Sequence, residues 1–430
     1  MTTTMKKKLL SALVALSCGF SVTHANAEDL MQVYEIALAN DPVVLKAKAT
    51  RDAQDYNTDI AMSRLLPQIG ASMGYSKVDG DAGDSDTFSR GVRLDQDLFN
   101  LGSWKSLNIA EKQALQADAS YRLAQQNLIV RVSNAYFNVL ARQDDLEFVR
   151  AEKRAIERQL EQTKQRHAVG LTAITDVHEA QAQYDNAVAR EIVALNDVET
   201  AREELGEITG KYHEKLNALN TDKFSTVKPA RKSTEFVESA KENNISLQVS
   251  RVSVDIAKEQ IEQAKAGHYP KLTLSASYGD KLGETGPRAD QTSVGLDFTV
   301  PIYQGGGTQA AVNQASEYFV AASQEFESAY RNVNKQVRTS YNQVVSDIAT
   351  YRALEQAVVS AESALQATEA GFEVGTRTIV DVLLSTRNLY DASRNLSAVR
   401  YRYVVSTLGL KLAEGTLSRS DIEAINRGLN

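Results

Sequence analysis

The segment Leu66-Pro-Gln-Ile-Gly-Ala-Ser-Met-Gly-Tyr75 recurs 203 residues later as Tyr269-Pro-Lys-Leu-Thr-Leu-Ser-Ala-Ser-Tyr278. After each proline, apolar residues alternate with polar or small ones, which is the period of a β-strand with one apolar face. A second alternating segment follows each copy, over residues 90–99 and 292–300. The sequence therefore predicts four strands, arranged as two pairs.

Two further motifs recur at nearly the same spacing. Asp97-Leu-Phe-Asn-Leu-Gly102 matches Pro301-Ile-Tyr-Gln-Gly-Gly306, and Val169-Gly-Leu-Thr-Ala-Ile-Thr-Asp-Val177 matches Val374-Gly-Thr-Arg-Thr-Ile-Val-Asp-Val382. The offset drifts by only two residues between the first motif and the last, which indicates a tandem duplication. We expect a first structural repeat over residues 28–227, a second over 228–415 and a C-terminal tail over 416–430.

Long helices connect these motifs. Residues 103–169 and 308–370 contain no Gly and no Pro, and at about 1.5 Å per residue such helices would be roughly 95–100 Å long. Two of the shorter helices placed end to end would match one long helix, so we expect them to stack in pairs alongside the long ones. Each repeat then reads helix, strand pair, long helix, helix. The strand pairs are expected over 67–99 and 270–302, and the shorter helices over 31–65, 171–205, 234–266 and 376–408.

The first residues predict export. Three lysines at 6–8 precede an apolar stretch that ends near Val22, and Ala25-Asn-Ala27 forms a small-x-small cleavage site. This is the pattern of a secretory signal peptide, which we place over residues 1–27. The mature chain would begin at Glu28.

The single cysteine, Cys18, lies within this leader. Lipidation of Cys18 is an alternative, although Ala15-Leu-Ser17 matches the preceding part of a lipobox poorly. A mature chain without cysteine excludes disulfides and thiolate metal sites. The leader carries three lysines and no acidic residue, so its removal changes the formal charge from −7 to −10. This charge argues against nucleic acid as a partner.

Catalytic constellations are missing from the mature sequence. It contains four histidines, and no paired histidine or cysteine completes a metal site: His167, His178, His213 and His268. We therefore expect no enzymatic activity, no cofactor and no metal.

The strands favour a membrane location. No segment after the leader reaches the 18–20 apolar residues of a transmembrane helix, but each strand has about ten residues, enough to cross an outer membrane when tilted. The alternative is a pair of soluble β-hairpins packed on a helical body. Four strands cannot close a membrane barrel, and lipid does not tolerate open sheet edges. Strands in a membrane would therefore require an oligomer, and this argument leaves dimer and trimer open.

The turn motifs at 169–177 and 374–383 resemble the inter-helix turns of the TolC family of outer-membrane efflux proteins. The resemblance extends through Leu408-Gly-Leu-Lys-Leu-Ala-Glu-Gly415. It implies a mixed α and β membrane protein, in which three protomers share a 12-stranded outer-membrane β-barrel continuous with a long α-helical barrel across the periplasm. It also implies an equatorial belt near residues 206–233 and the C-terminal tail.

The same resemblance implies a trimeric exit duct for multidrug efflux and type I secretion. Its periplasmic tip would be closed at rest and opened by a periplasmic adaptor (membrane fusion protein) and an inner-membrane transporter. A non-conducting periplasmic coiled-coil scaffold or adhesin is the alternative, as is a lipid-anchored efflux subunit. The alternating strands favour the duct, because a scaffold has no need for them.

The resemblance also implies functional residues at the tip. Family members close it with polar links from an aromatic residue and an Arg on one turn to the other turn. By position these are Phe372 and Arg377, facing Thr175 and Asp176. The aromatic residue is commonly Tyr, and Phe372 cannot donate a hydrogen bond.

Asp381 is implied as an acidic ring at the entrance, with Leu384 where a second Asp is common. The inter-helix turns, where we expect adaptor docking, carry Val169, Gly170, Val374 and Gly375.

Some of these residues also fit simple structural roles. Asp176 followed by Glu179 resembles a capping box, and Asp381 lies in a first helical turn, where a carboxylate is favourable. Gly170 and Gly375 are expected to end their helices as C-caps.

Overall fold

The computed structural model describes residues 27–79, 85–221, 223–283 and 289–429. The predicted leader over residues 1–26, with Cys18, lies outside the described residues. None of the helices within the described ranges combines the length and apolar content needed to cross a membrane.

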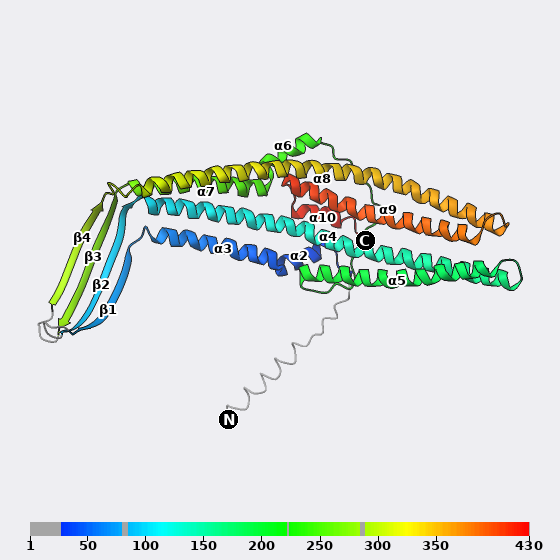
Figure 1. Ribbon diagram of the computed structural model, residues 1–430, viewed down its shortest axis with the longest axis horizontal. Coiled ribbons are helices and arrows are strands. Elements are labelled where there is room, and N and C mark those ends of the chain that lie inside the picture. Colours follow the sequence, from blue (N-terminus) through cyan, green and yellow to red (C-terminus); the bar gives the residue numbers. More distant parts are fainter. Residues whose placement is uncertain (1–26, 80–84, 222, 284–288, 430) are drawn as a thin grey trace, which may run out of the picture.

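Two long helices run along the helical part of the molecule (Figure 1). They are α4 (Leu101–Ala168) and α8 (Gly307–Glu373), close to the predicted bounds. The Asn100 side chain accepts a hydrogen bond from the Ser103 backbone at 3.3 Å and so begins α4. Gly305 and Gly306, with φ of 62° and 80°, form the junction that leads into α8.

The shorter helices pack end to end along the long ones. On the side nearest the strands, α3 (Pro42–Ser63) contacts α4 and α7 (Ile245–Lys265) contacts α8. Toward the far end, α5 (Ile174–Thr209) contacts α4 and α9 (Ile379–Glu414) contacts α8. Each long helix therefore has a stacked pair of shorter helices beside it.

Two of the expected helices are broken, and the single-helix predictions over 31–65 and 234–266 were wrong. The first divides into α2 (Leu30–Asn40) and α3, the second into α6 (Ser233–Asn243) and α7.

Asp41 and Asn244 explain the breaks. Each has an extended backbone conformation, and its side chain accepts a hydrogen bond from the first turn of the next helix, at 2.9 and 3.1 Å. Pro42 adds a second reason, since it has no N–H to continue α2 and favours the first position of a new helix.

The C-terminal part also departs from its predicted bounds. Helix α9 continues to Glu414, six residues beyond 408, and ends where Gly415 adopts a φ of 86°. The predicted tail over 416–430 contains a further helix, α10 (Arg419–Asn426).

The four predicted strands form one antiparallel sheet. They are β1 (Gln68–Val78), β2 (Ser85–Asn100), β3 (Lys271–Gly283) and β4 (Ala289–Thr299), in the order β1-β2-β3-β4. The hairpin from the first half of the chain therefore pairs with the hairpin from the second half, through β2 and β3.

The main core lies at mid-length, where α2, α6 and α10 gather around the long helices (Figure 1). Tyr136 is fully buried, and its hydroxyl donates to the backbone oxygens of Glu28 or Asn217, at 3.1 and 2.8 Å. The segment after α5 pairs with both ends of the described chain, since Leu216 bridges to Glu28 and Leu219 to Leu429. These contacts tie the chain together halfway along the helices.

Candidate functional site

The turns farthest from the sheet, α4–α5 and α8–α9, form the tip (Figure 1). Gly170 and Gly375 have φ of 78° and 81°, which confirms the prediction that they end their helices. In each turn a backbone N–H reaches five residues back. Leu171 donates to Arg166 at 2.8 Å, and Thr376 donates to Gly371 at 2.8 Å. Both long helices thus end in a Schellman motif.

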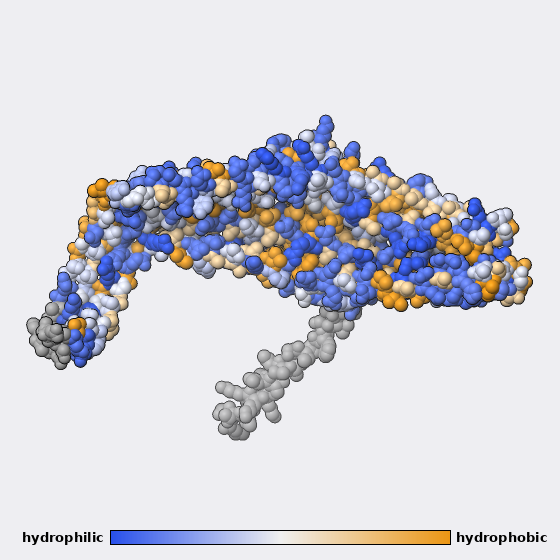
Figure 2. Space-filling model, in the orientation of Figure 1, coloured by the Kyte–Doolittle hydropathy of each residue, from blue (hydrophilic) through white to orange (hydrophobic). Residues whose placement is uncertain are grey.

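The tip leaves apolar side chains in solvent. Val169, Leu171 and Val374 are more than two-thirds exposed, and Ile174 is about half exposed. Figure 2 shows hydrophobic patches interrupting the hydrophilic surface of the helical part, including this end. Exposed apolar residues clustered on one end of a protein mark an interaction surface.

Asp381 caps its own helix. Its Oδ2 accepts hydrogen bonds from the backbone N–H and the hydroxyl of Thr378, both at 2.9 Å. The Thr378 hydroxyl in turn accepts from the Asp381 N–H at 3.3 Å. These hydrogen bonds, with a smaller contribution from Arg377, hold the pKa of the Asp381 carboxyl below its ordinary value. The carboxylate is therefore ionised at neutral pH.

Asp176 occupies the equivalent position of α5 but has a different partner. The N-cap residue of α5 is Ala173, whose side chain cannot accept a hydrogen bond. The expected capping box of Asp176 with Glu179 was therefore wrong. Asp176 instead accepts a hydrogen bond from the hydroxyl of Thr172, and Thr175 beside it is exposed.

Arg377 folds back over the end of α8. A Cβ atom placed on Gly371 would lie 2.7 Å from Cγ of Arg377, so the arginine stem crosses the helix where a side chain is missing. The Arg377 N–H also donates to the Gly371 oxygen at 3.2 Å. Across the described residues of one chain, no ion pair joins Arg377 to Asp176.

Phe372 contacts an arginine that the sequence did not single out. The guanidinium carbon of Arg166, on α4, lies 4.6 Å from the centroid of the Phe372 ring. Phe372 and Tyr184 also pack against a buried apolar cluster drawn from α4, α5 and α9: Ile156, Leu160, Ala180, Ala187, Ile379 and Leu383. The aromatic residue thus lies between the two helix pairs.

The sheet at the opposite end has two different faces. The residues of one face are largely apolar and exposed, among them Ile69, Met73, Val294, Leu296 and Phe298. The other face is polar, and its hydroxyl groups of Ser277 and Ser293 lie 2.8 Å apart. Exposed apolar residues on a sheet face need a covering of apolar material.

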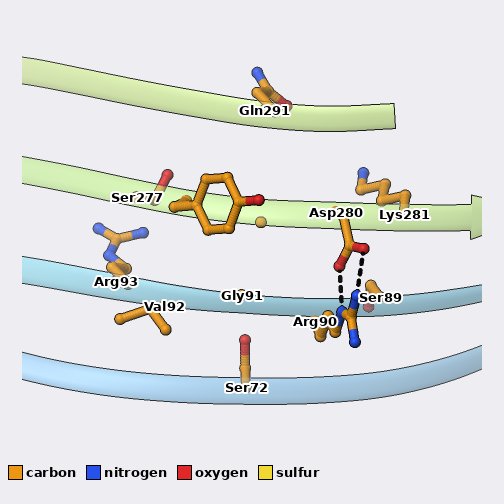
Figure 3. A pocket seen from close by; sticks show the side chains of 12 residues that line it. Ser72, Ser89, Arg90, Gly91, Val92, Arg93, Ser277, Asp280, Lys281 and Gln291 are labelled. Atoms are coloured by element: carbon orange, nitrogen blue, oxygen red, sulfur yellow. Dashed lines mark hydrogen bonds and ion pairs between the residues drawn. The ribbon is translucent and has the colours of Figure 1, made fainter. Parts of the chain in front are cut away.

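The seam between the two hairpins is closely joined (Figure 3). Arg90 on β2 forms two hydrogen bonds with Asp280 on β3, at 2.7 and 3.0 Å. Beside this pair, Gly91 lies opposite Gly279, and a Cβ on either would lie 3.0 or 3.1 Å from a backbone oxygen of the other strand. The glycines border a hollow of about 310 Å³ whose lining includes Ser72, Arg93, Ser277 and Gln291.

No group of three or more His, Asp or Glu side chains that could hold a metal ion occurs in the described ranges. The candidate functional features in the described ranges are therefore the exposed turns of the tip and the two faces of the sheet.

Comparisons with known proteins agree with this architecture. The outer membrane efflux protein family matches residues 33–211 and 236–416. The outer membrane protein TolC of Vibrio cholerae is 47% identical, over 98% of this chain and 99% of the relative. The alkaline protease secretion protein AprF of Pseudomonas aeruginosa is 30% identical, over 93% of this chain and 87% of the relative.

Solved structures share the fold. The outer membrane channel CmeC of Campylobacter jejuni superposes with a TM-score of 0.80 at 15% identity, covering 93% of this chain and 90% of that one. The family matches span most of the sequence and both copies of the repeat. The chain belongs to the TolC family of outer-membrane efflux proteins.

Proposed function

We propose that this protein is a passive exit duct through the outer membrane, used for efflux and for type I protein secretion. The observation that carries the proposal is the sheet, which has an exposed apolar face and a polar face. Among the described residues, β1 and β4 have no further strand beside them. Lipid does not tolerate unpaired backbone groups, so such a sheet must continue into neighbouring copies of the chain.

Three copies would supply twelve strands, enough to close a membrane barrel. The apolar face would contact outer-membrane lipid and the polar face would line the bore. The helices of the three copies would continue the passage through the periplasm. The likeness to an outer membrane channel of solved structure supports this arrangement.

The relatives support the cargo classes. One related protein is named for alkaline protease secretion and another is an outer membrane protein of the TolC type. Energy would come from an inner-membrane transporter, reached through a periplasmic adaptor. The adaptor would dock on the exposed apolar turns that carry Val169, Gly170, Val374 and Gly375.

The tip would be the gate. Three copies of Asp381 would form an acidic ring, and carboxylates around a narrow bore favour cations. Arg377 on the α8–α9 turn would link to Thr175 and Asp176 on the α4–α5 turn. Phe372 would complete the closure.

We also propose that the chain is a duplicated unit, with repeats over 28–227 and 228–415 and a tail over 416–430 at the equator. The double match to one family supports this division.

Purification from the outer membrane in detergent, followed by mass measurement and planar-bilayer recording, tests the proposal. We expect a trimer that conducts ions, with low conductance in the resting state. A monomer, or a trimer that never conducts under any voltage, would leave the non-conducting scaffold as the better explanation.

A further inference from the structure

The tip consists of two helix pairs, α4–α5 and α8–α9. The stretch of chain that joins one pair to the other lies away from the tip. The turn at Gly170 joins α4 to α5, and the turn at Gly375 joins α8 to α9. Each pair is therefore held together covalently at its end. Separation of one pair from the other is opposed only by non-covalent contacts between them.

The apolar cluster beneath Phe372 supplies part of that contact. Its members come from both pairs, with Ile156 and Leu160 on α4 facing Ile379 and Leu383 on α9. All four side chains are buried. Phe372 covers the end of this cluster nearest the turns, since it is the penultimate residue of α8.

Arg166 covers Phe372 from the other pair. Its guanidinium carbon lies 4.6 Å from the ring centroid, within the roughly 6 Å over which a cation is attracted to an aromatic face. Arg166 is half-buried although its neighbours Gln165 and His167 are exposed. Within the described residues it has no ion pair. The ring is its partner.

A backbone hydrogen bond of the α4–α5 turn holds Arg166 in position. Its carbonyl oxygen accepts the hydrogen bond from Leu171 that ends α4. The guanidinium is therefore carried by a helix end whose geometry the glycine turn determines. A shift of α8 relative to α4 would move the ring away from the cation without breaking any hydrogen bond of the turn.

We infer that Arg166 and Phe372 form a cation–π clamp that holds the α4–α5 pair against the α8–α9 pair and keeps the tip closed. The inference rests on the proposed duct function and adds a gating residue to it. A phenylalanine that cannot donate a hydrogen bond still fulfils this role, because the attraction depends on the ring face.

Planar-bilayer recording of the purified full-length protein tests the clamp. Phe372→Leu removes the ring face and Arg166→Gln removes the cation, and we expect each to raise the resting open probability by about three- to tenfold. The double variant should raise it no further than the stronger single variant, because both remove the same contact. Phe372→Tyr retains the ring face and should not raise the resting open probability.

Arg158→Gln is the matched control. Arg158 is an exposed arginine two turns earlier on α4, without an aromatic ring beneath it in the described structure. It should leave the resting state unchanged. Equal effects of Arg158→Gln and Arg166→Gln would reduce the result to net charge and overturn the clamp, as would additive effects in the double variant.

Failure of the clamp differs from failure of the duct. A protein that conducts, with Arg166→Gln and Phe372→Leu both at the unmodified resting level, overturns the clamp alone. A protein that conducts in none of the variants overturns the proposed function.

Discussion

Asp176 and Asp381 occupy the same position of the two repeats but hydrogen-bond to different threonines. Asp381 accepts from the backbone and side chain of Thr378, the N-cap of its helix. Asp176 accepts from the side chain of Thr172, one residue before the N-cap Ala173. One duplicated carboxylate thus caps its helix, and the other is bound to the turn that precedes it.

Asp381→Asn should weaken cation selectivity and block by multivalent cations, because it removes a charge from the proposed entrance ring. Reversal potentials in a salt gradient measure the change. Asp185→Asn, an exposed acid on α5, should leave selectivity unchanged. If Asp381→Asn is equally silent, Asp381 is a helix cap only.

The selectivity should also persist on acidification. The pKa of Asp381 lies below its ordinary value, so the carboxylate stays charged until the pH falls below the usual aspartate range of about 3.9. Thr378→Val removes one of the hydrogen bonds that lower this pKa. It should make cation selectivity decline at a higher pH. Identical pH profiles for the two proteins would contradict this reading.

Gly371→Ala should displace Arg377, because the new Cβ would overlap the arginine stem. We expect a rise in resting conductance, and Arg377→Ser, which removes the guanidinium, should give a similar rise. Stability should not fall by much, since alanine is favoured over glycine in a helix by about 1 kcal/mol.

Gly409→Ala provides the comparison. Gly409 lies within α9, and nothing lies within 4 Å of an added Cβ. It should stabilise the protein by about 0.5–1 kcal/mol and leave conductance unchanged. If Gly371→Ala leaves the resting conductance unchanged, the contact between Gly371 and the Arg377 stem does not position Arg377.

Glu28→Gln should lower stability at neutral pH by about 1–2 kcal/mol. Burial raises the pKa of the Glu28 carboxyl, but hydrogen bonds from Lys211 and His213 outweigh burial and hold the pKa below its ordinary value. This stabilisation is present above the ordinary pKa and is lost as the pH falls through the lowered value. The unfolding temperatures of Glu28→Gln and of the unmodified protein should therefore differ at pH 7 and converge in acid. A difference that grows in acid would contradict the stabilising role of the Glu28 carboxylate.

Gly415→Ala should be far more damaging than Gly375→Ala. Both glycines have φ above 80°, where alanine costs about 1–2 kcal/mol. At Gly415 an added Cβ would also lie 2.3 Å from the backbone oxygen of Asn243, whereas at Gly375 nothing lies within 4 Å. Yield and thermal unfolding of the two variants measure the difference. Equal losses of stability in the two variants would mean that the backbone at Asn243 moves at little cost to make room for the added Cβ.

The strands and long helices could be predicted because their signals are local and repeated. Alternation marked all four strands, and the absence of Gly and Pro marked α4 and α8. The breaks at Asp41 and Asn244 were missed because each is a single capping residue inside an otherwise helical pattern. Asp41 followed by Pro42 carried a readable signal, but Asn244 carried little.

The candidate site was predictable in part. The glycines of the turns and the capping role of Asp381 follow from short-range rules, and the structure shows both. The contact between Arg166 and Phe372 depends on how the ends of α4 and α8 are aligned, which no nearby residue encodes. The position of the Arg377 side chain over Gly371 could not be predicted either. It depends on the space left by the absent side chain of Gly371.

The seam between β2 and β3 has a consequence for symmetry. In a ring built from identical single hairpins, every seam between neighbouring hairpins would have the same residues. A substitution at one seam would then occur at every seam. Here Arg90, Asp280 and the facing glycines lie at a seam within one chain, while in the proposed barrel the edges of β1 and β4 would meet between chains. Because of the duplication, the seam within each chain can form as that chain folds, and the residues at the outer edges of β1 and β4 can change without changing this inner seam.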